Sequence, residues 1–414
     1  DRETVWHPYT PLRGADDPLV VESARDEFLY LQDGRTLIDA ISSWWTIQHG
    51  HRFPPLMKAI REASAKLDHV IFAGFTHAPA VELAHLLLAT MPWADGRVFY
   101  SDNGSTAVEV ALKMCYQFWC HRGEPHRKLF VCFENGYHGD TFGAMSVGRD
   151  PVFFGTFEPL LFRAIQIPVD EESLEKTLRE RGSEVAGVIL EPLVQGAGGM
   201  KMHSPRTLQT LWKICRNHDI PFVADEVMTG GGRTGTRWAF EQAEIAPDLV
   251  CAGKTLTGGV LPLSATLVSP RIREAFDTAD RKRTFFHGHS FTANPIACAV
   301  GVANFRAMES GEWVNQVRDV ETFWERVSEG WRSLPGVREV RIRGSIASIE
   351  LNASGGYLAD AGPTMRRTAI SQGVFLRPLG NVLYAMPPFR TSLESLERIR
   401  KAVESALLAV GRSI

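Results

Sequence analysis

Short runs of apolar or β-branched residues alternate with longer segments of helical period through the middle of the chain. This alternation is typical of βαβ units and predicts a mainly parallel sheet flanked by helices. The predicted strands are residues 98–100, 129–133, 186–190, 221–224, 249–252 and 264–268. The predicted helices are residues 79–90, 106–119, 172–181 and 205–217, and the second opens with a capping box from Thr106 to Glu109.

The alternation of short apolar runs with helical segments changes at about residue 312. A helix over 312–333, strands near 340–351 and 382–385, and a closing amphipathic helix over 393–409 indicate a separate α+β unit. The turn-rich segment before Trp44 is expected to pack with it. Because 414 residues exceed what one core usually holds, we predict an N-terminal segment (1–45), a large domain (46–310) and a small domain (311–414).

Composition narrows the class of protein. An apolar content of 44%, a charged content of 22% and a net charge of -3 are ordinary for a globular protein and provide no basic field for nucleic acid. The six cysteines are scattered, which favours reduced thiols and a cytoplasmic location. No apolar run spans a membrane and no secretory signal is visible, although the start at Asp1 rather than Met leaves a preceding leader open.

The chemically informative side chains follow the predicted strands. Ligands of open α/β sheets bind beyond the carboxyl ends of strands, so these positions form the candidate site. They are Gly104 and Ser105, Tyr137 and His138, Glu191, Asp225 and Glu226, and Lys254, each set following a different strand. Any one of them has a structural explanation, such as a helix cap, packing or a surface charge. Their convergence on one sheet edge predicts a shared site.

Three other motifs do not support a function. The triplet at 253–255 lacks the earlier glycine of a P-loop, because Asp248 stands at that position. The glycine run at 230–232 lacks the strand spacing of a dinucleotide fingerprint. His287 and His289 could begin a metal site, but no cysteine or carboxylate pattern accompanies them, so no metal is expected.

Pyridoxal phosphate requires the groups found at the strand ends. Its aldehyde takes a lysine amine, and its ring nitrogen needs a carboxylate so that the ring can accept electrons. Lys254 and Asp225 match these requirements, Gly104 and Ser105 at a helix N-terminus match the phosphate, and Tyr137 matches a ring face. We therefore predict a pyridoxal-phosphate enzyme with Lys254, Asp225 and Tyr137 as its catalytic residues.

The chain resembles the class III (omega) aminotransferases of pyridoxal-phosphate fold type I. The resemblance is carried by Tyr137-His138-Gly139, by the acidic and glycine-rich run at 225–235, and by Pro247-Asp248 leading to Lys254. Matching motifs extend from Trp6 to Pro388. The resemblance implies an α/β fold with a large, mainly parallel sheet domain and a smaller α+β domain from both termini, and it implies transamination of small molecules.

The resemblance also implies roles for further residues. Tyr9, Trp44 and Tyr137 would line the substrate slot, and Arg377 would bind a carboxylate of a medium-chain keto acid. Gly288 and the two residues after it would come from the neighbouring subunit of a homodimer to complete the phosphate site. Gly288-His289-Ser290 stands where the family often has Gly-Pro-Thr, so Ser290 keeps the hydroxyl while His289 replaces a rigid proline.

The amino donor is expected to be S-adenosylmethionine, because Trp44 and Tyr137 offer aromatic faces to a sulfonium group. Lysine is the alternative donor. Two rival functions stay open at this point. One is another omega-aminotransferase or an aminomutase acting on a diamine, an ω-amino acid or a semialdehyde, although Ala197 after Gln195-Gly196 argues against a glutamate-using relative. The other is a catalytically silent cofactor-binding protein.

Overall fold

A seven-stranded mixed sheet forms the centre of the molecule. The computed structural model describes the whole chain except residues 2, 149 and 412–414. The strand order is β4-β12-β11-β10-β7-β5-β6, in which only β12 runs antiparallel to its neighbours. The strands are β4 (Arg97–Ser101), β5 (Leu129–Phe133), β6 (Ala164–Ile167), β7 (Val185–Leu190), β10 (Phe222–Asp225), β11 (Leu249–Ala252) and β12 (Ser264–Val268). The six predicted strands are confirmed to within one residue at each end, and β6 was missed.

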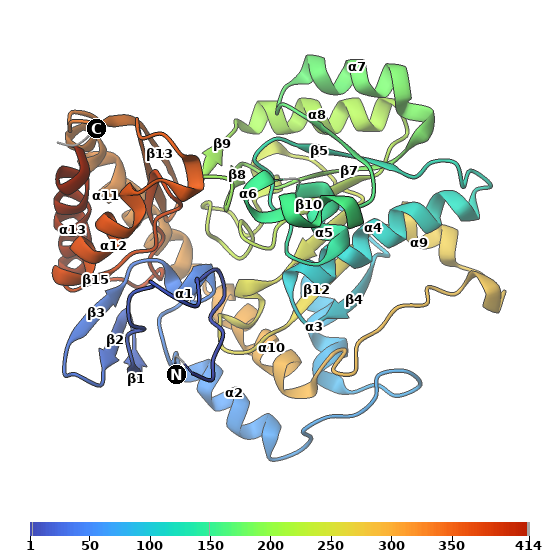
Figure 1. Cartoon of the computed structure of the whole chain (residues 1–414). Coiled ribbons are helices and arrows are strands. Elements are labelled where there is room, and N and C mark those ends of the chain that lie inside the picture. Colours follow the sequence, from blue (N-terminus) through green and yellow to red (C-terminus); the bar gives the residue numbers. More distant parts are fainter. Residues whose placement is uncertain (2, 149, 412–414) are drawn as a thin grey trace.

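Helices cover both faces of this sheet. α7 and α8 lie side by side on one side, and α4 runs along the other (Figure 1). The helices of this part are α2 (Pro54–Ser64), α3 (Ala78–Leu88), α4 (Gly104–His121), α5 (Phe142–Gly148), α6 (Pro151–Phe154), α7 (Glu171–Arg181), α8 (Pro205–Asn217), α9 (Pro270–Phe276) and α10 (Pro295–Glu309). The four predicted helices are confirmed to within two residues.

The capping box of α4 lies one turn earlier than predicted, so the predicted box from Thr106 to Glu109 was wrong. Asn103 is the N-cap, its side chain accepts a hydrogen bond from the backbone N–H of Thr106, and the Thr106 hydroxyl accepts one from the backbone N–H of Asn103. Glu109 instead accepts hydrogen bonds from the backbone N–H groups of Gly143 and Ala144. Because an asparagine ranks with aspartate as an N-cap, the helix can begin two residues earlier than predicted.

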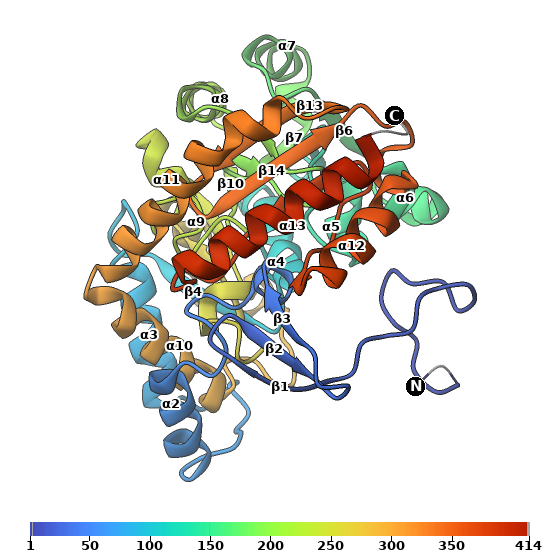
Figure 2. The same ribbon diagram turned by 90° about the vertical axis from the view of Figure 1, so that its left-hand side faces the viewer.

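The two ends of the chain build the remaining sheets together. β1 (Val21–Arg25), β2 (Phe28–Leu31) and β3 (Thr36–Asp39) form a four-stranded sheet with β15 (Val374–Phe375). β13 (Val337–Arg343), β14 (Ile346–Leu351) and β16 (Val382–Ala385) form a second sheet. Helices α11 (Glu312–Arg332), α12 (Ala361–Ser371) and α13 (Leu393–Gly411) lie beside these strands, as Figure 2 shows. The domain limits at residues 45 and 310 stay a prediction.

Short elements connect these units. They are α1 (Ser42–Trp45), the hairpin strands β8 (Val194–Gln195) and β9 (Lys201–Met202), and the 3₁₀ turns η1 (Gly155–Leu160), η2 (Gly182–Glu184), η3 (Ala239–Ala243), η4 (Lys254–Thr257), η5 (Arg281–Arg283) and η6 (Gly356–Leu358). Among the described residues, no helix combines the length and the apolar character that crossing a membrane requires.

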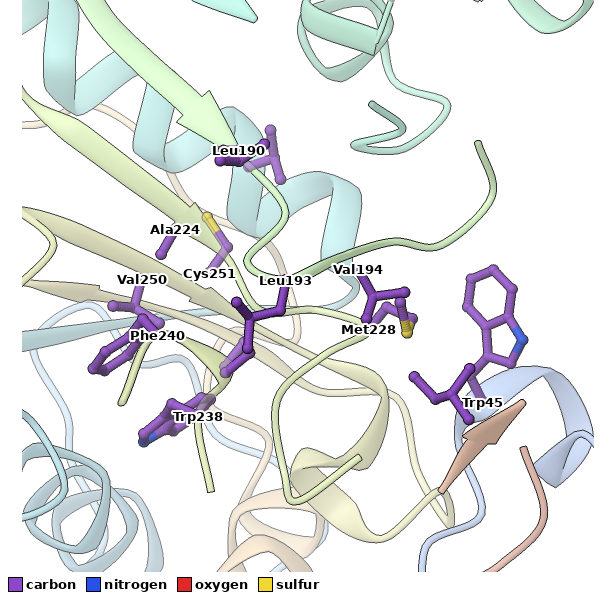
Figure 3. Close-up of a cluster of buried hydrophobic side chains, with 14 of the residues drawn as sticks. Trp45, Leu190, Leu193, Val194, Ala224, Met228, Trp238, Phe240, Val250 and Cys251 are labelled. Atoms are coloured by element: carbon purple, nitrogen blue, oxygen red, sulfur yellow. The ribbon is translucent and has the colours of Figure 1, made fainter. Parts of the chain in front are cut away.

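An apolar core supports the strand ends at which the predicted site lies. Leu190, Ala224, Val250 and Cys251 from neighbouring strands are at most 1% exposed. Figure 3 shows this cluster, with Met228 and Val194 at the end nearest Trp45. The groups that follow these strands therefore stand on closely packed side chains, which limits their movement.

Candidate active site

A cavity of about 440 Å³ lies at the carboxyl ends of the central strands. Its lining includes seven of the predicted candidate-site residues: Gly104, Ser105, Tyr137, His138, Glu191, Asp225 and Lys254. A second pocket, of about 420 Å³, is lined by aromatic side chains and is called here the aromatic pocket. Its lining residues are Pro8, Tyr9, Trp44, Trp45, Thr46, Tyr137, Phe153, Ala197, Lys254, Tyr357 and Leu379. Tyr137 and Lys254 line both spaces, so the two form one continuous candidate site.

Lys254 occupies a strained turn after β11. Its φ of 40° lies in the left-handed region, which costs about 1–2 kcal/mol for a residue with a side chain. The side-chain nitrogen of Lys254, Nζ, lies 5.1 Å from the centre of the Trp45 ring. Burial lowers the pKa of Lys254, and the carboxylates of Asp225 and Glu191 oppose this shift. A lowered pKa increases the fraction of neutral amine, which is the nucleophilic form.

A buried ion pair lies beside this lysine. Nδ1 of His138 is 2.6 Å from Oδ2 of Asp225, and Oδ1 of Asp225 accepts a hydrogen bond from the backbone N–H of Val227. Burial lowers the pKa of the His138 imidazole, but the hydrogen bond to Asp225 and the negative charges of Asp225 and Glu191 together outweigh this effect, so the pKa is raised. The hydrogen bonds from His138 and Val227 fix the orientation of the Asp225 carboxylate at the cavity.

Glu191 joins two parts of the site through its carboxylate. One oxygen accepts the backbone N–H of Tyr137 at 3.0 Å and the other accepts that of Gly196 at 2.9 Å. Burial raises the pKa of Glu191 to about 7. Because both carboxylate oxygens are used, Glu191 fixes the backbone that carries the Tyr137 ring relative to the loop that carries Ala197.

The N-terminus of α4 forms a cradle at the same edge. Gly104 packs so closely on Val227 that an added Cβ would lie 2.4 Å from that side chain. A Cβ on Gly139, whose φ is 124°, would lie 2.0 Å from the hydroxyl of Ser105. Glycine is therefore required at both positions to bring the Ser105 hydroxyl and the helix N-terminus to the cavity, where an anionic group would be stabilised.

A left-handed turn places two tryptophans in the site. Residues Ser42 to Trp45 all have positive φ, between 44° and 71°. Asp39 stabilises this turn by accepting hydrogen bonds from the backbone N–H and the hydroxyl of Ser43. The indole N–H of Trp45 donates to the hydroxyl of Tyr384 at 2.9 Å. This conformation could not be anticipated, because no glycine marks it in the sequence.

Tyr9 links the N-terminal segment to the aromatic pocket. Its hydroxyl lies 3.1 Å from that of Tyr137 and donates a short hydrogen bond to the carboxylate of Asp140. Its ring contacts the edge of Trp44, with 5.5 Å between ring centres. Burial, followed by the hydrogen bond to Asp140, raises the pKa of Tyr9 to about 12. Tyr9 is therefore a neutral donor at physiological pH.

Arg377 and the 288–290 loop lie at the margin of the site. The guanidinium carbon of Arg377 is 4.5 Å from the centre of the Trp44 ring, although Arg377 is not among the described residues that line either space. Gly288 and Ser290 are exposed, and His289 Nδ1 lies 3.7 Å from Asp102 of the same chain. Trp44 thus connects Arg377 to the aromatic pocket, whereas the loop contributes no lining residue from its own chain.

His287 and His289 interact with each other rather than with a metal-binding set. Their Nε2 atoms are 3.2 Å apart. Across the part of the chain that the structure describes, no group of three or more histidine, cysteine, aspartate or glutamate side chains could hold a metal ion.

The sequence analysis missed the residue that supports the tryptophan turn. Arg233 is fully buried and donates hydrogen bonds to the hydroxyl of Ser42 and to the backbone carbonyls of Trp45, Ile47 and Pro387. The glycine run before it was predicted not to be a nucleotide loop, and the arginine beside it was not considered further. A charged residue next to three glycines was the available signal.

Comparison with a family model matches residues 12–407 to "Aminotransferase class-III". The chain is similar to the adenosylmethionine-8-amino-7-oxononanoate aminotransferase of Synechococcus elongatus, with 44% identity over 97% of this chain and 98% of that protein. It is also similar to the protein of the same name from Geobacter sulfurreducens, with 36% identity over 99% of this chain and 97% of that protein.

Solved structures agree in fold. The crystal structure of adenosylmethionine-8-amino-7-oxononanoate aminotransferase from Methanocaldococcus jannaschii superposes with a TM-score of 0.93 at 32% identity, covering 98% of this chain and 97% of that one. A PLP-bound amine transaminase from an uncultivated Pseudomonas species gives a TM-score of 0.91 at 28% identity, covering 98% of each chain.

Proposed function

The chain belongs to the class III aminotransferase family, and on that premise we propose that it converts 8-amino-7-oxononanoate to 7,8-diaminononanoate in biotin biosynthesis. The observation that carries this proposal is the position of Lys254, whose side chain lines both the cavity beside Asp225 and the aromatic pocket. An amine at this junction can act on a bound cofactor on one side and on a substrate carbon on the other.

Pyridoxal 5'-phosphate is the cofactor that the family implies, and the side chains present fit it. The buried carboxylate of Asp225 would hold the ring nitrogen, Gly104 and Ser105 at the N-terminus of α4 would hold the phosphate, and Lys254 would bond to the aldehyde carbon. Tyr137 would pack against the ring. When bound, the cofactor supplies a carbonyl that takes up the amino group and a ring that withdraws electrons from the substrate carbon.

The protein's own side chains then have defined tasks. Nζ of Lys254 would take a proton from the substrate carbon and then give it up, acting first as base and then as acid. The lowered pKa of this amine favours the first of these transfers. His138 holds the Asp225 carboxylate in position, and Glu191 holds the backbone of Tyr137. The second substrate follows the same path in reverse, so the kinetics should be of the ping-pong type.

The aromatic pocket and Arg377 suit the acceptor. A nine-carbon keto acid presents a methylene chain and a terminal carboxylate. The rings of Tyr9, Trp44 and Tyr137 offer apolar surface to the chain, and Arg377 can bind the carboxylate through its fork of N–H donors.

S-adenosylmethionine is the proposed amino donor. A sulfonium group over an aromatic ring gains roughly 0.5–2 kcal/mol, and Trp44 and Tyr137 offer such rings. Lysine, the alternative, would need a carboxylate for its distal ammonium. Asp140, beside the aromatic pocket, already accepts the hydroxyl of Tyr9. The relatives from Synechococcus elongatus and Geobacter sulfurreducens also carry adenosylmethionine in their names.

We also propose a homodimer with shared sites in the cytoplasm. Phe286 and Phe291, which flank Gly288–Ser290, are 76% and 59% exposed, and exposed aromatics on both sides of a loop favour burial against a second subunit. In that assembly His289 and Ser290 would complete the partner's phosphate site. The free buried thiols of Cys115, Cys215, Cys251 and Cys298 suit a reducing compartment.

The direct test supplies the purified protein with pyridoxal phosphate, 8-amino-7-oxononanoate and one donor at a time. Formation of 7,8-diaminononanoate with S-adenosylmethionine supports both assignments. Product with lysine alone overturns the donor only. If neither donor gives product while a diamine, an ω-amino acid or a semialdehyde is turned over, the enzyme is a different omega-aminotransferase.

A further inference from the structure

One wall of the aromatic pocket is formed by Phe153 of α6, a residue that the sequence analysis did not single out. Its ring centre lies 4.5 Å from that of Tyr357 and 6.0 Å from those of Tyr9, Tyr137 and Phe154. Tyr9 belongs to the N-terminal segment, Tyr137 follows β5, and Tyr357 belongs to η6. Phe153 is therefore the point at which three distant segments meet around the pocket.

This wall presents hydrocarbon to whatever occupies the pocket. Phe153 has no polar atom in its side chain, and the hydroxyls of Tyr9 and Tyr137 are already hydrogen-bonded to each other. A substrate group that packed on the Phe153 ring would lose its water without gaining a hydrogen bond from that ring, so the ring favours an apolar chain over a charged end.

The wall is also fixed in position. The side chain of Asp150 caps α6 by accepting hydrogen bonds from the backbone N–H groups of Val152 and Phe153, at 2.8 Å and 3.4 Å. The neighbouring Phe154 is 2% exposed and anchors the same turn in the core. A ring held at its backbone and contacted by four other rings cannot move aside without disturbing all of them.

We infer that Phe153 is a specificity-determining residue that limits the length of the acceptor chain. The inference deepens the proposed function and rests on it. A smaller side chain at this position opens room for additional methylene groups, and a larger one removes room that the natural acceptor uses. Each buried methylene contributes about fourfold to kcat/KM, since its transfer from water gains about 0.8 kcal/mol.

The test compares the wild-type enzyme with Phe153→Ala and Phe153→Trp. For each enzyme, kcat/KM is measured with 8-amino-7-oxononanoate and with its homologue extended by one methylene. The ratio of the extended to the natural acceptor should rise about fourfold in Phe153→Ala and fall by a similar factor in Phe153→Trp. Phe153→Leu replaces the alanine variant if that protein does not fold.

A matched control comes from the next turn of the chain. Phe157 of η1 is 40% exposed, contacts Phe142, and is not among the described residues that line the aromatic pocket. Phe157→Ala should leave the ratio unchanged. A purely structural role for Phe153 would lower both kcat/KM values equally, and an unchanged ratio in both Phe153 variants would overturn the inference. Rejection of 8-amino-7-oxononanoate by the wild-type enzyme would instead overturn the proposed function, and the ratio would then be measured with homologues of the acceptor it uses.

Discussion

His138 donates a hydrogen bond to Asp225 across 2.6 Å, in a pair that is nearly completely buried. The two residues lie on different segments, His138 after β5 and Asp225 at the end of β10. The interaction orients the carboxylate that would hold the ring nitrogen of the cofactor.

Replacing Asp225 by asparagine should lower kcat about 10²–10³-fold, because a neutral amide cannot stabilise a protonated ring nitrogen. Steady-state kinetics at saturating cofactor provide the measurement. Asp248→Asn is the matched control, since Asp248 is also buried but pairs with Arg271 at the other end of β11. It should lose stability while keeping kcat. Equal losses of kcat in both variants would argue against the assigned role of Asp225.

The free energy of unfolding should depend on pH through the ionisation of Glu226. Burial raises its pKa to about 7 in the folded protein, above the ordinary value of 4.5. The folded state therefore binds a proton more tightly than the unfolded state. Below pH 4.5 this difference in pKa contributes about 3 kcal/mol to the free energy of unfolding. The contribution is lost as pH rises to about 7.

Glu226→Gln removes this ionisation. The free energy of unfolding of the wild type, relative to the variant, should therefore fall between pH 4.5 and 7. Denaturant titrations of both proteins across this range provide the difference. A constant difference would show that Glu226 ionises at the same pH in the folded and unfolded states.

Arg377→Ala should raise KM for the keto acid about 10- to 150-fold, because a hydrogen bond to a charged group contributes about 1.5–3 kcal/mol. The half reaction with the donor should be nearly unaffected. Arg367→Ala is the control, as Arg367 is 60% exposed and pairs with Asp16 rather than with the pocket. If the arginine at 377 can be removed without a change in KM, another group binds the carboxylate.

The sequence could predict the site residues that are placed by their own strand. It could not predict roles that depend on contacts between distant segments. Lys254 and Asp225 follow strands with clear apolar patterns, so topology alone brought them to one edge. The pairing of His138 with Asp225 and the hydrogen bond from the backbone N–H of Tyr137 to Glu191 join residues more than 50 positions apart in the sequence. The position of Phe153 in the aromatic pocket could not be predicted for the same reason, because nothing in its local sequence pattern indicates which rings surround it.

The strand pattern was informative for a related reason. The inner strands of the central sheet are buried on both faces and read as continuous apolar runs, as in β7 (Val185–Leu190). By contrast, β1 lies at the edge of its four-stranded sheet, is mostly exposed and carries no such run. The pairing of β3 with β15 in that sheet is a long-range contact that periodicity cannot reveal.

The shared-site proposal makes a specific prediction for mixed subunits. Ser290→Ala should weaken binding of the cofactor, and Lys254→Ala should be inactive. A heterodimer of the two variants contains one intact site and one doubly damaged site. At limiting cofactor, mixing the variants should therefore restore up to half of the activity of a wild-type dimer. No recovery after subunit exchange, or full activity of a monomer in sedimentation, would rule out the shared site.

The most direct test of the central claim, that Lys254 carries out transamination in this cavity, is a single-turnover comparison of wild type, Lys254→Ala and Lys213→Ala. Lys213 lies on α8 and donates to Gln209, away from the cavity, so it controls for loss of a lysine. All three proteins should fold and bind pyridoxal phosphate. Only the wild type and Lys213→Ala should convert the cofactor to its amine form on addition of S-adenosylmethionine and then pass the amino group to 8-amino-7-oxononanoate. Amino transfer by folded Lys254→Ala at the wild-type rate would contradict the assignment.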